Sequence, residues 1–274
     1  MDKNEKENND NIDITYWFEL FTHSIDKNCQ LKHSKNINIS MIDHKMNLPF
    51  GDILEINEIT NINSINSIKN NLNKNTIPNN YIACLIDNRT ELFNLLTYNY
   101  ISQLSIYFPL SQEKYLLTTS RIIISNNYKE DYNYTKTTDK PNKYFNKEFN
   151  TYFNHLNSIY NEDILNTKWK QLTNEDKLKY EVVEPGTIKF DDKKNNDDLS
   201  KYEAQEEMLY SKNFSVVYFI PLDIDYVIYP PPQVVANSRK PQFESLYKPA
   251  KKVKRFYHHL DLESCKWIVK ELNP

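Results

Sequence analysis

The chain has 274 residues, a formal net charge of −3 and a pI of about 6.1. This balance provides no basic excess for nucleic-acid binding, and no apolar run approaches the ~18 residues of a membrane span. A hydrophobic content of 39% can supply a core, while a mean hydropathy of −0.73 predicts a folded body with polar insertions.

Glycine and cysteine usage excludes further classes of site. Gly51 and Gly186 are the only glycines, whereas a Rossmann or Walker phosphate loop needs several. The three cysteines, Cys29, Cys84 and Cys265, are far apart and form no CxxC pair, which favours a reducing compartment and argues against zinc. We therefore expect a cytoplasmic protein without a metal site.

The first part of the chain predicts a tail, a helix and a hairpin. Residues 1–11 are polar, without a secretory signal, and are expected to be a disordered, dispensable tail. Residues 37–43 and 52–59 are predicted strands, with Pro49 and Gly51 indicating a turn between them. Apolar residues at helical spacing predict a helix from about residue 15 to 27: Trp17, Leu20, Phe21 and Ile25.

The middle of the chain predicts strand, helix and hairpin in sequence. After a polar insertion at 60–80, residues 81–87 are an apolar run typical of a buried strand, and 90–99 form a short helix capped by Thr90. Residues 101–110 and 114–125 are predicted strands joined by a tight turn.

The remainder alternates polar segments with strands. A loop at 126–145 precedes a helix at 147–160, and Thr173 with Asp176 imitates a capping box. A charged insertion follows at 187–207. We then predict two strands within 214–229, one strand at 253–260 and one at 265–274. Many strands with few helices indicate a mainly β (α+β) antiparallel barrel with helical additions, in one domain over 12–274.

Three features carry alternative interpretations. His258 and His259 face opposite sides of a strand, so we expect no shared metal. Arg121 either pairs with a carboxylate inside the barrel or points to solvent, and we expect solvent. A local basic cluster is either a phosphate or partner patch or, as we expect, solvated loop charge: Arg239, Lys240, Lys251, Lys252, Lys254 and Arg255.

Five segments, in order along most of the chain, resemble one known family. They are WFELFTHSI, DNRTELFNLLTYN with the hairpin that follows it, WKQLTNEDKLKYEVVEPG, FSVVYFIPLDIDYVIY and the terminal Trp267 with Asn273-Pro274. Together they are similar to the pyridoxamine 5'-phosphate oxidase-like, Alr4036-type FMN-binding split-barrel family. The segment PPPQVVANSRKPQFESLYKPAKK resembles the fungal-like form of that family. The resemblance implies an antiparallel Greek-key barrel with flanking helices.

The resemblance also implies a function and a site. It implies a cytoplasmic homodimer that binds the flavin nucleotide FMN between its subunits, without nucleic-acid or membrane partners, and a flavin-dependent oxidoreductase of unknown substrate. Arg89 and Thr90 lie in DNRT (87–90), which resembles the family's D-x-R-S pattern, and they are candidate phosphate ligands, although Arg89 also fits a surface arginine beside a helix cap. Lys114 and Tyr115, on the hairpin, are further candidates, and Lys114 also fits a solvated turn lysine.

The departures from the family pattern fall on its basic positions. A charge-assisted hydrogen bond contributes about 1.5–3 kcal/mol, so losing three weakens affinity by roughly 10³–10⁶. The rival hypothesis is therefore a non-catalytic split-barrel relative with a degenerate flavin site, acting as a binding or structural protein. The third hypothesis is a true pyridoxamine phosphate oxidase. Non-basic residues occupy five of the basic positions: Asp52, Asn57, Leu92, Leu116 and Glu271.

Overall fold

The structure, a computed structural model, describes residues 16–43, 45–61, 80–126, 162–181, 210–230, 252–261 and 266–273. Several predicted segments lie on residues outside these ranges: the tail 1–11, the helix 147–160, the insertion 187–207 and most of the insertions 60–80 and 126–145. Within these ranges, no helix has the length and apolar character needed to cross a membrane.

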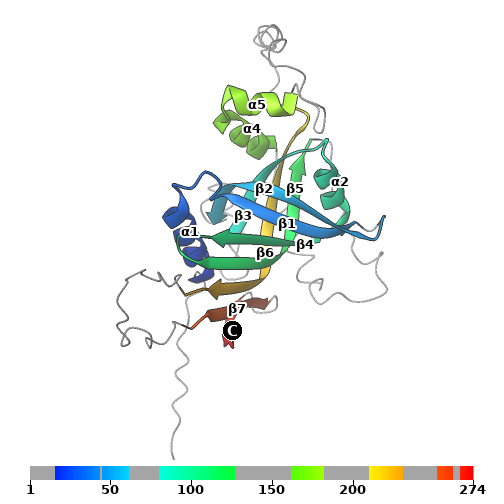
Figure 1. Cartoon of the computed structure of the whole chain (residues 1–274). Coiled ribbons are helices and arrows are strands. Elements are labelled where there is room, and N and C mark those ends of the chain that lie inside the picture. Colours follow the sequence, from blue (N-terminus) through cyan, green and yellow to red (C-terminus); the bar gives the residue numbers. More distant parts are fainter. Residues whose placement is uncertain are drawn as a thin grey trace, which may run out of the picture.

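The described part of the chain contains eight strands and four helices (Figure 1). The strands are β1 (Asn36–Asp43), β2 (Leu48–Asn61), β3 (Asn80–Asp87), β4 (Ile101–Phe108), β5 (Glu113–Ser125), β6 (Phe214–Ile228), β7 (Lys254–Asp261) and β8 (Lys266–Leu272). The helices are α1 (Tyr16–Asn28), α2 (Glu91–Tyr98), α4 (Glu162–Gln171) and α5 (Asn174–Glu181).

The strands form one antiparallel sheet in the order β3-β2-β1-β4-β5-β6-β7-β8, and an additional pairing of β3 with β6 closes six of them into a barrel. The first half of β6 pairs with β3 and its second half pairs with β7, so β7 and β8 leave the barrel at this point. The connection from β3 to β4 contains α2 and skips two strands, as in a Greek-key barrel. The predicted barrel with flanking helices is therefore confirmed.

Helix α2 forms where its capping signals predict it. The hydroxyl of Thr90 accepts a hydrogen bond from the Phe93 amide at 3.2 Å and donates one to the Asp87 carbonyl at 2.8 Å. A cap of this kind stabilises a helix by about 1 kcal/mol. The apolar face of α2 is buried in the barrel core: Leu92, Phe93, Leu95 and Leu96.

The turn between β1 and β2 lies earlier than predicted. The Asp43 carboxylate accepts hydrogen bonds from the amides of Lys45 and Met46 at 2.8 and 3.3 Å, and Asn47 has a φ of 55°. These are the marks of a turn made by Asp and Asn. The predicted turn at Pro49 and Gly51 is wrong, because both residues lie within β2 and pair with β1.

Residues 214–228 form one strand, although two were predicted. Thr118 of β5 pairs with Asp223 and Thr119 pairs with Pro221, so Leu222 is an extra residue that forms a β-bulge. A bulge tolerates proline, which lacks a donor for the sheet. The bulge also exchanges the faces of β6: Val217 and Phe219 contact the barrel core before it, and Ile224 and Tyr226 after it.

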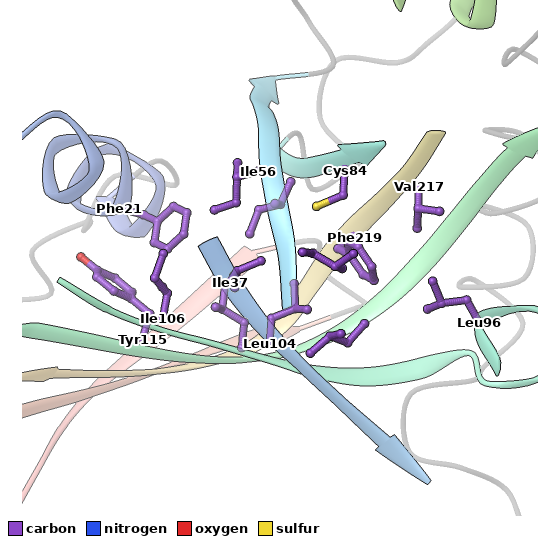
Figure 2. Packing of buried hydrophobic residues seen from close by; sticks show 14 of the residues in the cluster. Phe21, Ile37, Ile56, Cys84, Leu96, Leu104, Ile106, Tyr115, Val217 and Phe219 are labelled. Atoms are coloured by element: carbon purple, nitrogen blue, oxygen red, sulfur yellow. The ribbon is translucent and has the colours of Figure 1, made fainter. Parts of the chain in front are cut away.

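Two hydrophobic clusters lie on opposite sides of this strand. Figure 2 shows the first, inside the barrel, where Phe21 of α1 and Leu96 of α2 pack at the ends of the strands. In the second, Leu165 and Trp169 of α4 and Tyr180 of α5 cover the outer face of β6. Burying each such side chain contributes about 1.5–3 kcal/mol. Helix α4 was not predicted, whereas the predicted cap of α5 is present, with the Asp176 amide donating to Thr173 Oγ1 at 3.1 Å.

Arg121 does not point to solvent as expected. Its side chain is fully buried, and its guanidinium donates to the carbonyls of Asn99 and Thr97 at 3.1 Å each, over the ring of Tyr100. The odd-numbered residues of β5 face the barrel interior, and Arg121 belongs to that series. Its charge is met there by the carbonyls at the C-terminus of α2.

Candidate functional site

The four candidate residues lie in two places that are far apart in one chain. Arg89 and Thr90 follow β3, whose last residue, Asp87, pairs with Phe214 of β6. Lys114 and Tyr115 begin β5, and Lys114 pairs with Val227 of the same strand. Thirteen residues of β6 separate the two places, which corresponds to roughly 40 Å along the strand.

At the first place, the corner between β3 and α2, Arg89 is engaged with its neighbours. Its Nε and Nη2 atoms donate to both Asp87 carboxylate oxygens, with the shortest distance 2.6 Å, and Nη2 also donates to the Lys179 carbonyl at 3.2 Å. The Arg89 side chain is 23% exposed and that of Asp87 is 11% exposed. An incoming phosphate would have to compete with this carboxylate.

The same corner holds the C-terminal end of α5. Besides the bond from Arg89 to Lys179, the Tyr180 carbonyl accepts hydrogen bonds from Ser211 Oγ at 3.2 Å and Asn213 Nδ2 at 2.9 Å. The last carbonyls of a helix otherwise lack partners and carry partial negative charge. Arg89 therefore links β3 to α5 through its bonds to Asp87 and Lys179, while part of its side chain remains exposed to solvent.

At the second place, Lys114 lines a hollow of about 360 Å³ on the outer face of the sheet. This volume lies in the range of small-molecule pockets. Its walls come from β5, β6, β7 and the residues beside them: Lys114, Leu116, Asp225, Val227, Tyr229, Val253 and Arg255. The hollow therefore combines apolar walls with two cationic side chains and one carboxylate.

The charges in the hollow are partly matched. Arg255 donates from Nε and Nη2 to the two carboxylate oxygens of Asp225 at 2.9 and 2.6 Å, and these bonds raise the pKa of Arg255. Lys114 is exposed on the neighbouring strand. An anionic ligand in the hollow would meet the ammonium of Lys114 directly and the guanidinium of Arg255 through its remaining donors.

Tyr115 faces the barrel interior, on the opposite side of β5 from Lys114. It is fully buried and stacks on Tyr226 with ring centroids 4.5 Å apart. Its hydroxyl lies 3.0 Å from Ser24 Oγ, which donates to the Glu113 carboxylate at 2.6 Å, and Tyr226 donates to the same carboxylate at 2.7 Å. Tyr115 therefore supports the strands beneath the hollow and does not line it.

The five substituted basic positions are also dispersed. Asp52 and Asn57 are exposed on β2, Leu92 is buried in α2, and Glu271 is exposed on β8. Leu116 alone of the five lines the hollow, where it contributes an apolar wall. The cationic groups at the two candidate places are Arg89, paired with Asp87, Arg255, paired with Asp225, and Lys114.

The two adjacent histidines face opposite sides of β7, as predicted. His258 is buried, and burial lowers its pKa to about 4. His259 is 40% exposed, with Nδ1 2.6 Å from the Asp223 carboxylate. The described ranges contain no group of three or more His, Cys, Asp or Glu placed to hold a metal. The pairing of His259 with Asp223 was not predicted, because it depends on the bulge in β6.

Comparison with known proteins identifies the fold. The sequence matches no protein-family model, and no curated protein matches it. Among solved structures, a pyridoxamine 5'-phosphate oxidase-related, FMN-binding protein from Nostoc punctiforme PCC 73102 has a TM-score of 0.59 at 12% identity, over 94% of this chain and 97% of that one. PhzG from Burkholderia lata 383, solved with tetrahydrophenazine-1-carboxylic acid, has a TM-score of 0.56 at 7% identity, over 94% and 91%. The chain therefore has the FMN-binding split-barrel fold.

Proposed function

We propose that this protein binds FMN and acts as a flavin-dependent oxidoreductase, as a homodimer in the cytoplasm. The observation that supports this most is the likeness of fold to an FMN-binding protein over almost the whole of both chains. The hollow of about 360 Å³ beside Lys114 adds a site of suitable size. The dispersed cysteines support a reducing compartment.

The separation of the two candidate places favours a site shared by two subunits. One FMN molecule is far shorter than the roughly 40 Å along β6 that separates Arg89 from Lys114 in one chain. A twofold axis can bring the corner of one subunit to the hollow of its partner, and it does so twice. In this arrangement Arg89 and Thr90 bind the phosphate, and the partner's Lys114 lies beside the flavin ring.

The residues present fit such a ligand, with reduced strength. Leu116, Val227 and Val253 offer apolar surface to a flavin ring, and Lys114 offers a cation to its polar edge. Arg89 must give up part of its bonding to Asp87 before it can bind a phosphate fully. The affinity is therefore expected to be lower than in a site with a complete set of arginines.

Bound FMN would supply electron-pair transfer at its N5 atom, which protein side chains cannot perform. The chain would provide binding and orientation: Arg89 holds the phosphate, Lys114 fixes the polar edge of the ring, and Leu116 and Val227 exclude water from it. Electrostatic interactions strengthen when water is excluded.

Mixing two defective variants tests the shared site. Arg89→Ala and Lys114→Ala should each weaken FMN binding, the first by roughly 10- to 150-fold. If each site takes Arg89 from one subunit and Lys114 from the other, a heterodimer of the two variants has one intact site. Co-refolding equal amounts should restore tight binding to about a quarter of all sites, measured by flavin fluorescence.

Three results would change the proposal. A monomer mass by light scattering, or no recovery on mixing, would exclude the shared site. Equal FMN affinity of the wild type and Arg89→Ala would remove Arg89 from it. If the purified wild-type protein is colourless and does not bind added FMN, the non-catalytic relative becomes the better interpretation.

A further inference from the structure

A second cluster of functional side chains lies on the same sheet face as the hollow. Asp223 accepts hydrogen bonds from Tyr257 Oη at 2.9 Å and from His259 Nδ1 at 2.6 Å, both at its Oδ1 atom. The rings of Tyr257 and His259 are parallel within 3°, with centroids 6.5 Å apart. The imidazole is thus held by a hydrogen bond on one edge and by a parallel ring on one face.

The β-bulge in β6 is what directs Asp223 to this face. Because Leu222 is an extra residue, Asp223 faces outward and pairs across the sheet with His259, while Ile224 faces the core. Bulges commonly re-aim side chains next to active sites. Asp223 is 6% exposed, so its carboxylate is largely withdrawn from water.

The hydrogen bond determines which nitrogen of His259 can react. An ionised carboxylate only accepts hydrogen bonds, so Nδ1 carries the proton that lies toward Asp223. Nε2 is then the atom that can take or give a proton at the exposed edge of the ring. A carboxylate behind an imidazole orients it and stabilises its protonated form, which is the arrangement used in general acid–base catalysis.

This pair lies next to the hollow. Asp225, which lines the hollow, is two residues from Asp223 on the same face of β6, or about 7 Å. Tyr257 pairs across the sheet with Asp225, and so lies between the hollow and His259. A ligand that extends from the hollow along β6 and β7 would therefore reach His259.

We propose that His259, held by Asp223, donates a proton to the electron acceptor that reacts with the flavin. This inference rests on the proposed binding of FMN. With dioxygen as the acceptor, bound reduced FMN would supply two electrons and one proton, and the imidazolium of His259 would give the second proton from Nε2. The products are oxidised FMN and hydrogen peroxide, and His259 then regains a proton from water.

Chemical modification tests the position of His259 without any turnover. Diethyl pyrocarbonate should modify His259 at Nε2, and saturating FMN together with a non-reacting anion should slow this reaction. His23 and His33, which are exposed elsewhere, serve as internal controls and should not be protected. Mass spectrometry assigns each modified histidine.

The pH profile of reoxidation tests its role. In stopped-flow mixing of reduced, FMN-loaded protein with air-saturated buffer, the wild-type rate should fall as the pH rises. His259→Gln should be slower by at least about tenfold and lose this dependence, and Asp223→Asn should lie between. His23→Gln is the matched control. Other titratable or charged groups lie on the same face: Lys114, Asp225, Tyr229, Arg255, Tyr257, Asp261, Lys266 and Lys270.

The outcomes separate the two proposals. Protection by FMN and a lost pH dependence in His259→Gln, with FMN still bound by fluorescence, support the inference. If FMN binds to the wild type but leaves His259 equally reactive, or if His259→Gln keeps the wild-type profile, the inference is wrong and the proposed function stands. If FMN does not bind to the wild type, both fail.

Discussion

Arg89 and Arg121 both donate to carbonyl groups at the C-terminal ends of helices, Arg89 at α5 and Arg121 at α2. Such carbonyls lack partners within the helix and attract cations. The guanidinium is well suited to this position because it presents several donors in a rigid plane. Each arginine therefore links a helix end to a strand of the barrel.

His258 should make the protein less stable in acid. Burial lowers its folded pKa to about 4, below the unfolded value of about 6.5, so the unfolded state binds the proton more tightly. The contribution of neutral His258 to the free energy of unfolding is fully present above about pH 6.5 and is lost as pH falls toward 4. The free energy of unfolding should therefore fall by about 2 kcal/mol between pH 7 and pH 5.

Urea unfolding at these two pH values measures the effect. His258→Leu should reduce the difference in unfolding free energy by this amount, since leucine does not titrate. His23→Gln, at an exposed position on α1, should retain the wild-type difference. An unchanged difference in His258→Leu would show that folding does not lower the pKa of this histidine.

Single residues were the hardest feature to predict from the sequence. Thr90 was predicted correctly because a cap depends only on the next three residues. Arg121 was not, although the alternation of Tyr115, Leu117 and Ile123 on one face of β5 indicates that it points inward. Its acceptors at Thr97 and Asn99 are brought near it only by the folding of α2 across the barrel end.

At the scale of elements, the contact between β3 and α5 makes a testable contribution to stability. Arg89→Ala removes donors from the largely buried Asp87 carboxylate and from the Lys179 carbonyl, which should lower the unfolding free energy by about 1–3 kcal/mol even without FMN. Lys179→Ala removes only an exposed pair with Asp176 and should cost about 0.5 kcal/mol or less.

Chemical denaturation of the ligand-free protein compares the two variants. Near-equal stabilities of Arg89→Ala and the wild type would mean that the corner contributes little to holding α5, and would leave Arg89 free for a binding role alone. Circular dichroism in the same samples shows whether helix content is lost together with stability.

Element types were predicted more reliably than element ends. Strands β3, β4, β5, β7 and β8 follow from apolar runs, and β5 joins β4 at the expected tight turn. The turn before β2 was misplaced because Pro49 and Gly51 are stronger general signals than Asp43 and Asn47, which form it. Helix α4 was missed because its buried residues, Leu165 and Trp169, contact β6 only in three dimensions.

For the whole molecule, Cys84 reports on the closure of the barrel. It is fully buried in β3, pairing with Ile56 of β2 and Val217 of β6, and burial raises its pKa. The thiolate is the form that attacks thiol reagents, so the reaction of Cys84 should be very slow in the folded protein.

A Cys265→Ser background isolates this measurement. Cys29, which is exposed, should react at once with a thiol reagent, while Cys84 should react only at denaturant concentrations that unfold the chain. Rapid reaction of both thiols in native buffer would mean that β3 separates from β6 without global unfolding, and that the barrel is open for part of the time.

The fold was predicted from the ordered motifs of the chain, but the distance between the candidate residues within one chain was not. The motif residues Arg89 and Lys114 lie at opposite ends of β6, and a linear pattern holds no information on which ends a second subunit would bring together. Tyr115 shows the same limit, since its neighbour Lys114 faces the outer surface while it faces the core.

The bulge at Leu222 makes the length of β6 as important as its composition. If Leu222 were paired like any other residue of β6, simple alternation would place Asp223, Asp225 and Val227 in the barrel core, with Ile224 and Tyr226 outside. A one-residue deletion within 223–228 would have the same effect on the residues that follow it, whereas deleting Leu222 itself would remove the bulge and keep the faces. Insertions and deletions among related chains should therefore avoid residues 223–228 and gather in the connections between strands.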